Sequence, residues 1–190
     1  MQGMINRWLE GFLRTSYGDA FWNEALVAAR LANSDFLTLS TDRKGAARRI
    51  LLTAARKLEK PLDEMLEDLG AWLVQRESLR RLLRFSGPDF AEFVQSLDEL
   101  PGRARLVLLD MPLISLTVER TGAQEYRIGS EEMPLGWIWV LAGGLRGMAD
   151  DYGALAVIAV SDKWIDLSIV VEEFALSRPF LLMPQPEVAP

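Results

Sequence analysis

Apolar residues recur at helical spacing through the first half of the chain. Between residues 5 and 18 they stand three and four positions apart, and Tyr17-Gly18 offers a stop. Similar patterns predict further helices over residues 19–32, 41–60, 61–75, 77–87 and 88–100. We therefore expect the first half to fold as a helical bundle.

The apolar pattern changes from about residue 104. Short β-branched runs bounded by Gly, Pro or charged turns predict strands within residues 105–122, 125–131, 153–163 and 166–174. An apolar helix is expected between them over residues 136–153, with Gly153 as its C-cap. The order strand, strand, helix, strand, strand favours an antiparallel sheet over alternating βα units.

These patterns predict an α+β fold in which an N-terminal helical subdomain packs on a four-stranded antiparallel sheet with a long helix. We expect one domain over residues 1–182, with a helical part at about 1–102 and a sheet part at about 104–182. The proline-rich residues 183–190 are predicted to form a flexible tail.

Composition excludes most familiar catalytic chemistry. The 190 residues include 0 His and 0 Cys, so no imidazole base, thiolate nucleophile or Cys/His zinc site can form. The formal net charge of −6 disfavours nucleic acid as a partner. The start is not a signal peptide, and no apolar run is long enough for a membrane span. We expect a cytoplasmic protein that is not an enzyme and does not bind a membrane.

Several local features favour ordinary structural roles. Adjacent acidic pairs, such as Asp150-Asp151, point in different directions and are typical of surface. The Gly-rich stretch 143–147 favours close helix packing, since it lacks a phosphate-loop lysine. The arginines of residues 76–84 favour a solvated helix face. Trp137 and Trp139, two residues apart, are not expected to face one core together, so one is a candidate for a groove or an interface.

Five segments of the chain resemble segments of the haem nitric-oxide/oxygen-binding (H-NOX) family, and they occur in the same order as in that family. They are "MQGMINRWLEGFL", "YGDAFW", "LEDLGAWLV", "LRFSGPDFAEFVQSLDELPGRARL" and "GWIWVLAGGLRGMADDYG". The resemblance extends over nearly the whole chain. It implies the same helical subdomain and antiparallel sheet that the hydrophobic pattern predicts.

The haem contacts of that family are not retained in this sequence. The resemblance places the proximal histidine at Pro101, which has no side-chain donor atom for iron. The family's Tyr-x-Ser-x-Arg propionate motif falls on Ser130, Glu132 and Pro134, or on Ile128, Ser130 and Glu132. Either register loses the tyrosine and the arginine, and the Glu132 carboxylate would repel propionates. The resemblance also places Ile5 and Pro112 where family members line the haem pocket.

We therefore expect a haem-independent H-NOX-like sensor or regulatory domain without a metal or other cofactor. By analogy with the family, its partner would be a signalling protein such as a histidine kinase or a cyclic-dinucleotide enzyme. One alternative is a haem-binding NO/O2 sensor that uses Met111, Met133 or Tyr126 as its ligand. Another is a binder of a different hydrophobic small molecule in the vacated pocket. Self-association is also compatible with the sequence.

Overall fold

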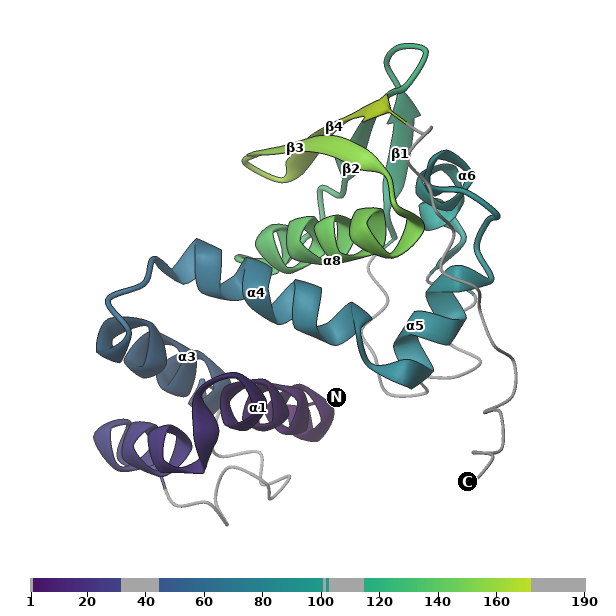
Figure 1. Cartoon of the computed structure of the whole chain (residues 1–190). Helices are drawn as coiled ribbons and strands as arrows, with labels where there is room; N and C mark the ends of the chain where they lie inside the picture. The colour runs from purple at the N-terminus through teal and green to yellow at the C-terminus, as the bar shows by residue number, and fades with distance from the viewer. Residues whose placement is uncertain (1, 32–44, 101, 103–114, 172–190) are drawn as a thin grey trace, which may run out of the picture.

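The computed structural model describes residues 2–31, 45–100, 102 and 115–171 of the chain. The predicted tail at 183–190 and the first part of the strand predicted within residues 105–122 lie outside the described residues. The predicted α+β fold is confirmed: the helical N-terminal part is followed by a four-stranded antiparallel sheet with a long helix against it (Figure 1).

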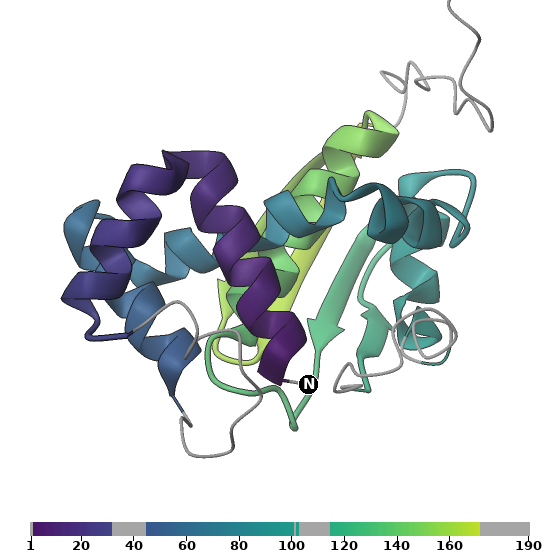
Figure 2. The same ribbon diagram turned by 90° about the horizontal axis from the view of Figure 1, so that it is seen from below.

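The first two predicted helices form one bent helix, α1 (Gln2–Ala28). The bend lies at Gly18, whose φ of 89° and ψ of 163° are not helical, so the stop predicted from Tyr17-Gly18 is present as a kink (Figure 2). Glycine reaches this positive φ without the steric penalty of a Cβ. None of the helices in the described ranges is long and apolar enough to cross a membrane.

Helices α3 (Ala46–Lys57) and α4 (Leu62–Val74) pack with α1 around an N-terminal core. Its fully buried side chains include Phe12, Leu13, Trp22, Ile50 and Met65. Pro61 stands at the N-cap of α4, and the first turn carries Asp63 and Glu64, whose negative charges favour a helix N-terminus. This core is separate from the one beneath the sheet.

Two short helices lead from α4 towards the sheet. They are α5 (Glu77–Arg84) and α6 (Phe90–Gln95), and the 3-10 turn η2 (Ser96–Asp98) extends the second. Asp89 caps α6 because its Oδ1 accepts a hydrogen bond of 2.8 Å from the Glu92 backbone N–H.

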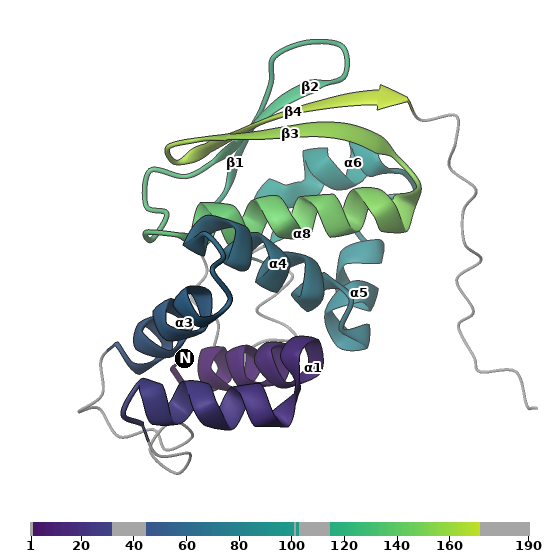
Figure 3. The ribbon, with the colours of Figure 1, turned by 60° about the vertical axis from the view of Figure 1, so that its left-hand side comes forward.

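The sheet has the strand order β1-β2-β4-β3, with every neighbouring pair antiparallel. The strands are β1 (Thr117–Arg120), β2 (Glu125–Gly129), β3 (Leu155–Ser161) and β4 (Trp164–Val171). Helix α8 (Trp137–Tyr152) lies along one face, between the sheet and α4 (Figure 3). Gly153 ends α8 with a left-handed φ of 70°, which confirms the predicted C-cap.

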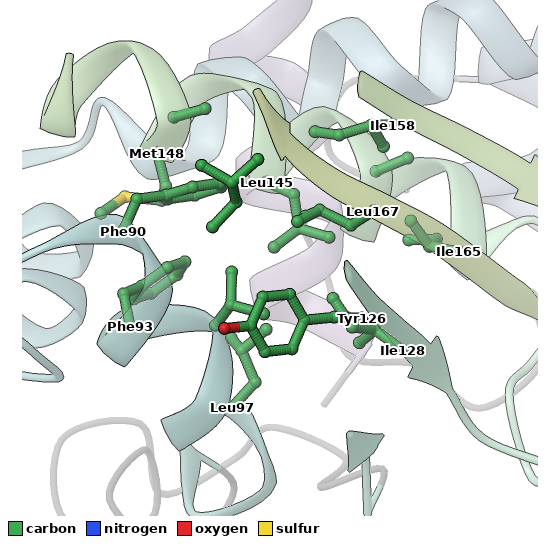
Figure 4. Packing of buried hydrophobic residues seen from close by; sticks show 14 of the residues in the cluster. Phe90, Phe93, Leu97, Tyr126, Ile128, Leu145, Met148, Ile158, Ile165 and Leu167 are labelled. Carbon is green, nitrogen blue, oxygen red and sulfur yellow. The ribbon is translucent and has the colours of Figure 1, made fainter. Parts of the chain in front are cut away.

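The second core lies between the sheet, α8 and the α6–η2 segment (Figure 4). Its residues alternate along the strands, because successive strand side chains face opposite sides of a sheet. The residues labelled in Figure 4 are Phe90, Phe93, Leu97, Tyr126, Ile128, Leu145, Met148, Ile158, Ile165 and Leu167.

Glycines allow α4 and α8 to cross at very short range. A Cβ added at Gly70 would overlap the backbone carbonyl of Val140, and one added at Gly143 would overlap that of Glu67. At Gly147 an added Cβ would stand 2.6 Å from Val74 Cγ2. The prediction that the 143–147 stretch serves close helix packing is therefore confirmed.

Two arginines of α5, Arg80 and Arg84, bind the end of α8, whereas Arg81 is exposed and pairs with Glu77 of the same helix. Arg80 donates two hydrogen bonds to Asp151 Oδ1, at 2.8 Å from Nε and 2.5 Å from Nη2. The Arg84 guanidinium lies 4.1 Å above the Tyr152 ring and 3.7 Å from the Asp151 carboxylate. The expectation of a solvated face agrees with the exposed Arg76 and Arg81. It is wrong for Arg80 and Arg84, because α5 folds back against the C-terminal turn of α8.

Tyr152 joins this cluster to the core. Its hydroxyl donates a hydrogen bond of 2.9 Å to the Gly87 carbonyl, and its ring packs against Phe90 and Phe93. Burial raises the pKa of Tyr152 above its ordinary value, and the positive charge of Arg84 opposes this in part. The folded state therefore favours the neutral form of the Tyr152 side chain.

We predict that Gly143→Ala lowers the free energy of unfolding by about 2 kcal/mol, since the methyl group must displace the α4 backbone. Gly144→Ala is the matched control, because its Cβ would lie 3.4 Å from Val74 Cγ1, an ordinary contact. That control should be neutral or stabilising, since alanine favours a helix over glycine. Urea unfolding followed by circular dichroism measures both. Equal stabilities would show that the helices do not meet as closely as described.

We predict that stability falls as the pH rises above about 10. The folded state raises the pKa of Tyr152 and Tyr17 through burial, and that of Lys60 through its hydrogen bond with Asp68. The stability they contribute is present below their unfolded pKa and is lost as the pH passes the folded one. Tyr152→Phe should be less stable than the wild type at pH 8, and the gap should narrow above pH 10. Denaturant unfolding at both pH values measures this, and a constant gap would contradict it.

Candidate functional site

The resemblance points to the space between the α6–η2 segment and the sheet as the place of a ligand. Pro101, Met111 and Pro112 lie outside the described residues, so their predicted roles stay predictions. The described side of this region consists of α6, η2, β2 and the turn between β2 and α8. These elements show what the remaining candidate residues contact.

Ser130 is the first residue after β2 and is buried. Its Oγ accepts a hydrogen bond of 3.2 Å from the Glu132 backbone N–H, and its carbonyl accepts one of 3.2 Å from Met133 N–H. A serine that binds backbone two residues ahead stabilises a turn locally. The Ser130 hydroxyl thus already stabilises the turn that connects β2 to α8.

The other positions of the degenerate propionate motif do not offer an anion site. The Glu132 residue is exposed, and its carboxylate carries the wrong charge for a propionate. Ile128 is fully buried in the sheet core. Lys163, a nearby cation, donates a hydrogen bond of 2.8 Å to the Glu131 carbonyl and lies 3.5 Å from the Glu131 carboxylate. It joins the β3–β4 hairpin to the turn before α8.

Tyr126 projects from β2 towards α6 and is buried (Figure 4). Its hydroxyl accepts a hydrogen bond of 3.2 Å from Gln95 Nε2. Phe93 and Leu97 belong to the same core cluster, so aromatic and aliphatic side chains surround this part of β2. As an iron ligand, Tyr126 would have to give up the Gln95 hydrogen bond and its packing.

Met133 and Ile5 differ in how they are placed. Met133 is buried in the sheet core, where a thioether acts as an apolar filler. Ile5 lies in α1, is half-buried, and belongs to neither of the two hydrophobic clusters. Its role in lining a pocket therefore stays a prediction.

Both Trp137 and Trp139 are half-buried, and both pack against the sheet core. The expectation that they cannot face one core together is wrong. The sheet core spreads over α5, α6, α8 and all four strands, so it is broad enough to meet rings on two sides of α8. Neither ring is therefore singled out as an interface residue by its position.

The sequence reasoning missed the ion pairs that hold α8. It treated Asp151 as surface, whereas the carboxylate is mostly buried between Arg80 and Arg84. It also missed Arg146, which pairs with Glu67 of α4 and donates a hydrogen bond of 3.0 Å to the Ile158 carbonyl of β3. The partners are far apart in the chain, so spacing within the sequence carries no signal of these contacts.

The described residues do not fit a haem held as the resemblance implies. The chain has no histidine or cysteine, and no cluster of acidic residues in the described ranges could hold a metal ion. Ser130 is committed to a turn, Glu132 has the wrong charge, and Tyr126 lies in a packed core. In the described part of the chain these side chains serve packing and turn formation.

The fold is that of solved H-NOX domains. An H-NOX protein from S. oneidensis in the Fe(II)NO ligation state is 14% identical, with a TM-score of 0.73, and the match covers 90% of this chain and 100% of that one. A variant of an S. oneidensis H-NOX protein in the Fe(II) ligation state is 16% identical, with a TM-score of 0.75 and coverage of 92% and 99%.

A third solved structure is an oxygen-binding H-NOX domain related to soluble guanylate cyclases. It is 16% identical, with a TM-score of 0.64 and coverage of 89% of this chain and 95% of that chain. At such identities the likeness establishes the fold alone. No curated protein matches the sequence.

The sequence itself provides the evidence of family. The family model described as Haem-NO-binding matches residues 2–129, which include the helical subdomain and the first two strands. This match agrees with the order of the five segments and with the four-stranded sheet. The chain therefore belongs to the Haem-NO-binding family.

Proposed function

We propose that this chain is a non-catalytic, haem-independent regulatory domain that acts by contact with a signalling enzyme. The observation that carries the proposal is the combination of a retained family fold with the loss of its haem contacts. The family model matches residues 2–129 and the fold match covers 90% of the chain, while the sequence holds no histidine or cysteine to bind iron. Function must then reside in surfaces of the fold.

The contacts of the remaining candidate residues support this proposal. Ser130 and Tyr126 both spend their hydroxyl groups on internal hydrogen bonds. Met133 lies within the apolar core. Binding haem through any of them would require the loss of packing that now stabilises the domain.

The proposed partner class rests on analogy. One structurally similar protein is an oxygen-binding H-NOX domain related to soluble guanylate cyclases. We propose a histidine kinase or a cyclic-dinucleotide enzyme as the partner here, encountered in the cytoplasm. The acidic balance of the chain, with a net charge of −6, favours a protein partner over nucleic acid.

We predict that the protein purified from cells supplied with haemin shows no stoichiometric Soret band, because the chain has no histidine or cysteine and packing engages Tyr126 and Met133. Absorption spectroscopy with the haem-to-protein ratio measures this, and native mass spectrometry of the same sample tests for another bound small molecule. A stoichiometric band that shifts with NO would overturn haem independence. In that event, loss of the band in Tyr126→Phe or Met133→Leu would identify the ligand.

We also predict that the purified chain changes the activity of its partner, a histidine kinase or a cyclic-dinucleotide enzyme. The rate should change at a chain concentration near the Kd measured by calorimetry. The effect should be the same with and without NO, since no haem is present to sense the gas. No binding and an unchanged rate would contradict the partner proposal, and an NO-dependent effect would contradict haem independence.

A further inference from the structure

Strand β3 forms one outer edge of the sheet and pairs with β4 alone among the described residues (Figures 1 and 3). An edge strand leaves a row of backbone N–H and C=O groups without strand partners. The opposite edge, β1, carries Glu119 and Arg120, charges that oppose pairing with another chain. The sequence of β3, Leu-Ala-Val-Ile-Ala-Val-Ser, carries no charge at all.

The hairpin between β3 and β4 determines which backbone groups face outward. Its two-residue turn, Asp162-Lys163, is flanked by the pair Ser161 and Trp164. The pair flanking such a turn is hydrogen-bonded, and hydrogen-bonded and non-hydrogen-bonded pairs then alternate along the ladder. This alternation directs the backbone groups of Ala156, Ile158 and Val160 away from β4.

Two further contacts agree with this assignment. The Ile169 N–H donates a hydrogen bond of 2.9 Å to the Gln124 carbonyl, on the side of β2, so it does not bind its β3 partner Ala156. Arg146 Nη2 donates a hydrogen bond of 3.0 Å to the Ile158 carbonyl, which an arginine of α8 reaches only if that carbonyl faces outward. Within the described part of the chain, neither Ala156 nor Val160 has a hydrogen bond on the outer side.

The side chains beside this edge are apolar and accessible. On the face of the sheet away from α8, Leu155 and Val157 are each 59% exposed. Val170 of β4 is 55% exposed at the same end, where the β3–β4 register shifts by one residue. An uncharged strand flanked by exposed aliphatic side chains combines unpaired backbone groups with apolar surface.

We propose that β3 is a self-association surface, on which the β3 strand of a second copy of this chain pairs antiparallel. A two-fold axis at Ile158 places Ile158 opposite its own counterpart and Ala156 opposite Val160 of the second copy. These are the residues whose backbone groups face outward, so the N–H and C=O groups of each strand meet those of the other in hydrogen-bonded pairs. The two sheets thereby join into one eight-stranded sheet.

The side chains in this register are also self-complementary. Val157 lies opposite Ala159 of the second copy, and Leu155 lies opposite Ser161. No pair places like charges against each other, and the apolar pairs lose water-exposed area. A second copy thus satisfies both the backbone and the side-chain requirements of this edge.

Arg146 limits access to the edge. It pairs with Glu67 and donates to the Ile158 carbonyl, an acceptor that the central pair of the dimer also needs. The guanidinium must therefore share or release this oxygen when the second strand arrives. Removing the Arg146 side chain is expected to strengthen self-association.

Sedimentation-velocity measurements of the full chain over a range of concentrations test the proposal. The wild type should reach a monomer–dimer equilibrium, and Val157→Lys should raise the dimer Kd by about tenfold or more, since each copy places a lysine in the apolar row. Val27→Lys is the matched control, because Val27 is 78% exposed on α1, away from the sheet. It should leave the Kd unchanged, and circular dichroism should show both variants folded.

A charge-complementation experiment tests the register itself. Ala159→Glu should weaken its own homodimer as Val157→Lys does. A mixture of the two variants should regain association, because the new lysine lies directly opposite the new glutamate. Arg146→Ala should lower the dimer Kd severalfold, as the freed carbonyl favours pairing.

Three results would overturn the proposal. One is a wild type that stays monomeric at concentrations of hundreds of micromolar, together with a monomeric Arg146→Ala variant. Another is a dimer that Val157→Lys and Val27→Lys weaken equally. The third is a failure of the Val157→Lys and Ala159→Glu mixture to associate better than either variant alone. A failed partner-enzyme assay would leave this test unaffected, since self-association is measured on the chain by itself.

Discussion

The close crossing of α4 and α8 is the constraint on which the rest of the structure depends. Two helix backbones can approach this closely only where glycines replace side chains, as Gly70 and Gly143 do. Helix α4 supplies Met65 to the N-terminal core and Val74 to the sheet core. The two hydrophobic cores share no residue, and the crossing of α4 and α8 joins them. It also fixes the position of the sheet relative to the helical part.

The contacts around α8 follow from this position. Because α8 is held against α4, its C-terminal turn reaches α5, where Asp151 meets Arg80 and Arg84. Its middle turns place Arg146 between Glu67 and the β3 edge. One helix thus connects the helical part, the sheet face and the sheet edge.

The family fold is preserved here by packing. Aromatic and aliphatic residues of α6 and β2, including Phe93 and Tyr126, form a continuous core where the family resemblance implies a cofactor. Burial of apolar area in this core stabilises the arrangement of these elements. This packing explains how a chain without histidine or cysteine can keep the architecture of the family.

Much of the fold could be predicted from local patterns. The helical spacing, the β-branched runs, the stop at Gly18 and the cap at Gly153 all depend on neighbours within a few residues, so the sequence shows them directly. The candidate site was less predictable. The absence of histidine is visible in the sequence, and the resemblance predicts Pro101 at the position of the proximal ligand. The hydrogen bonds of Ser130 within a turn and of Tyr126 with Gln95 are known only from the packed structure.

The sequence by itself thus determined the element types, the α+β class and the absence of imidazole and thiolate chemistry. Only the tertiary structure decided which charged groups pair, which rings share a core and which backbone groups of β3 face outward. The reason is physical: helix and strand periodicity arise from short-range geometry, while contacts such as Arg80 with Asp151 or Arg146 with Ile158 depend on how distant segments are brought together.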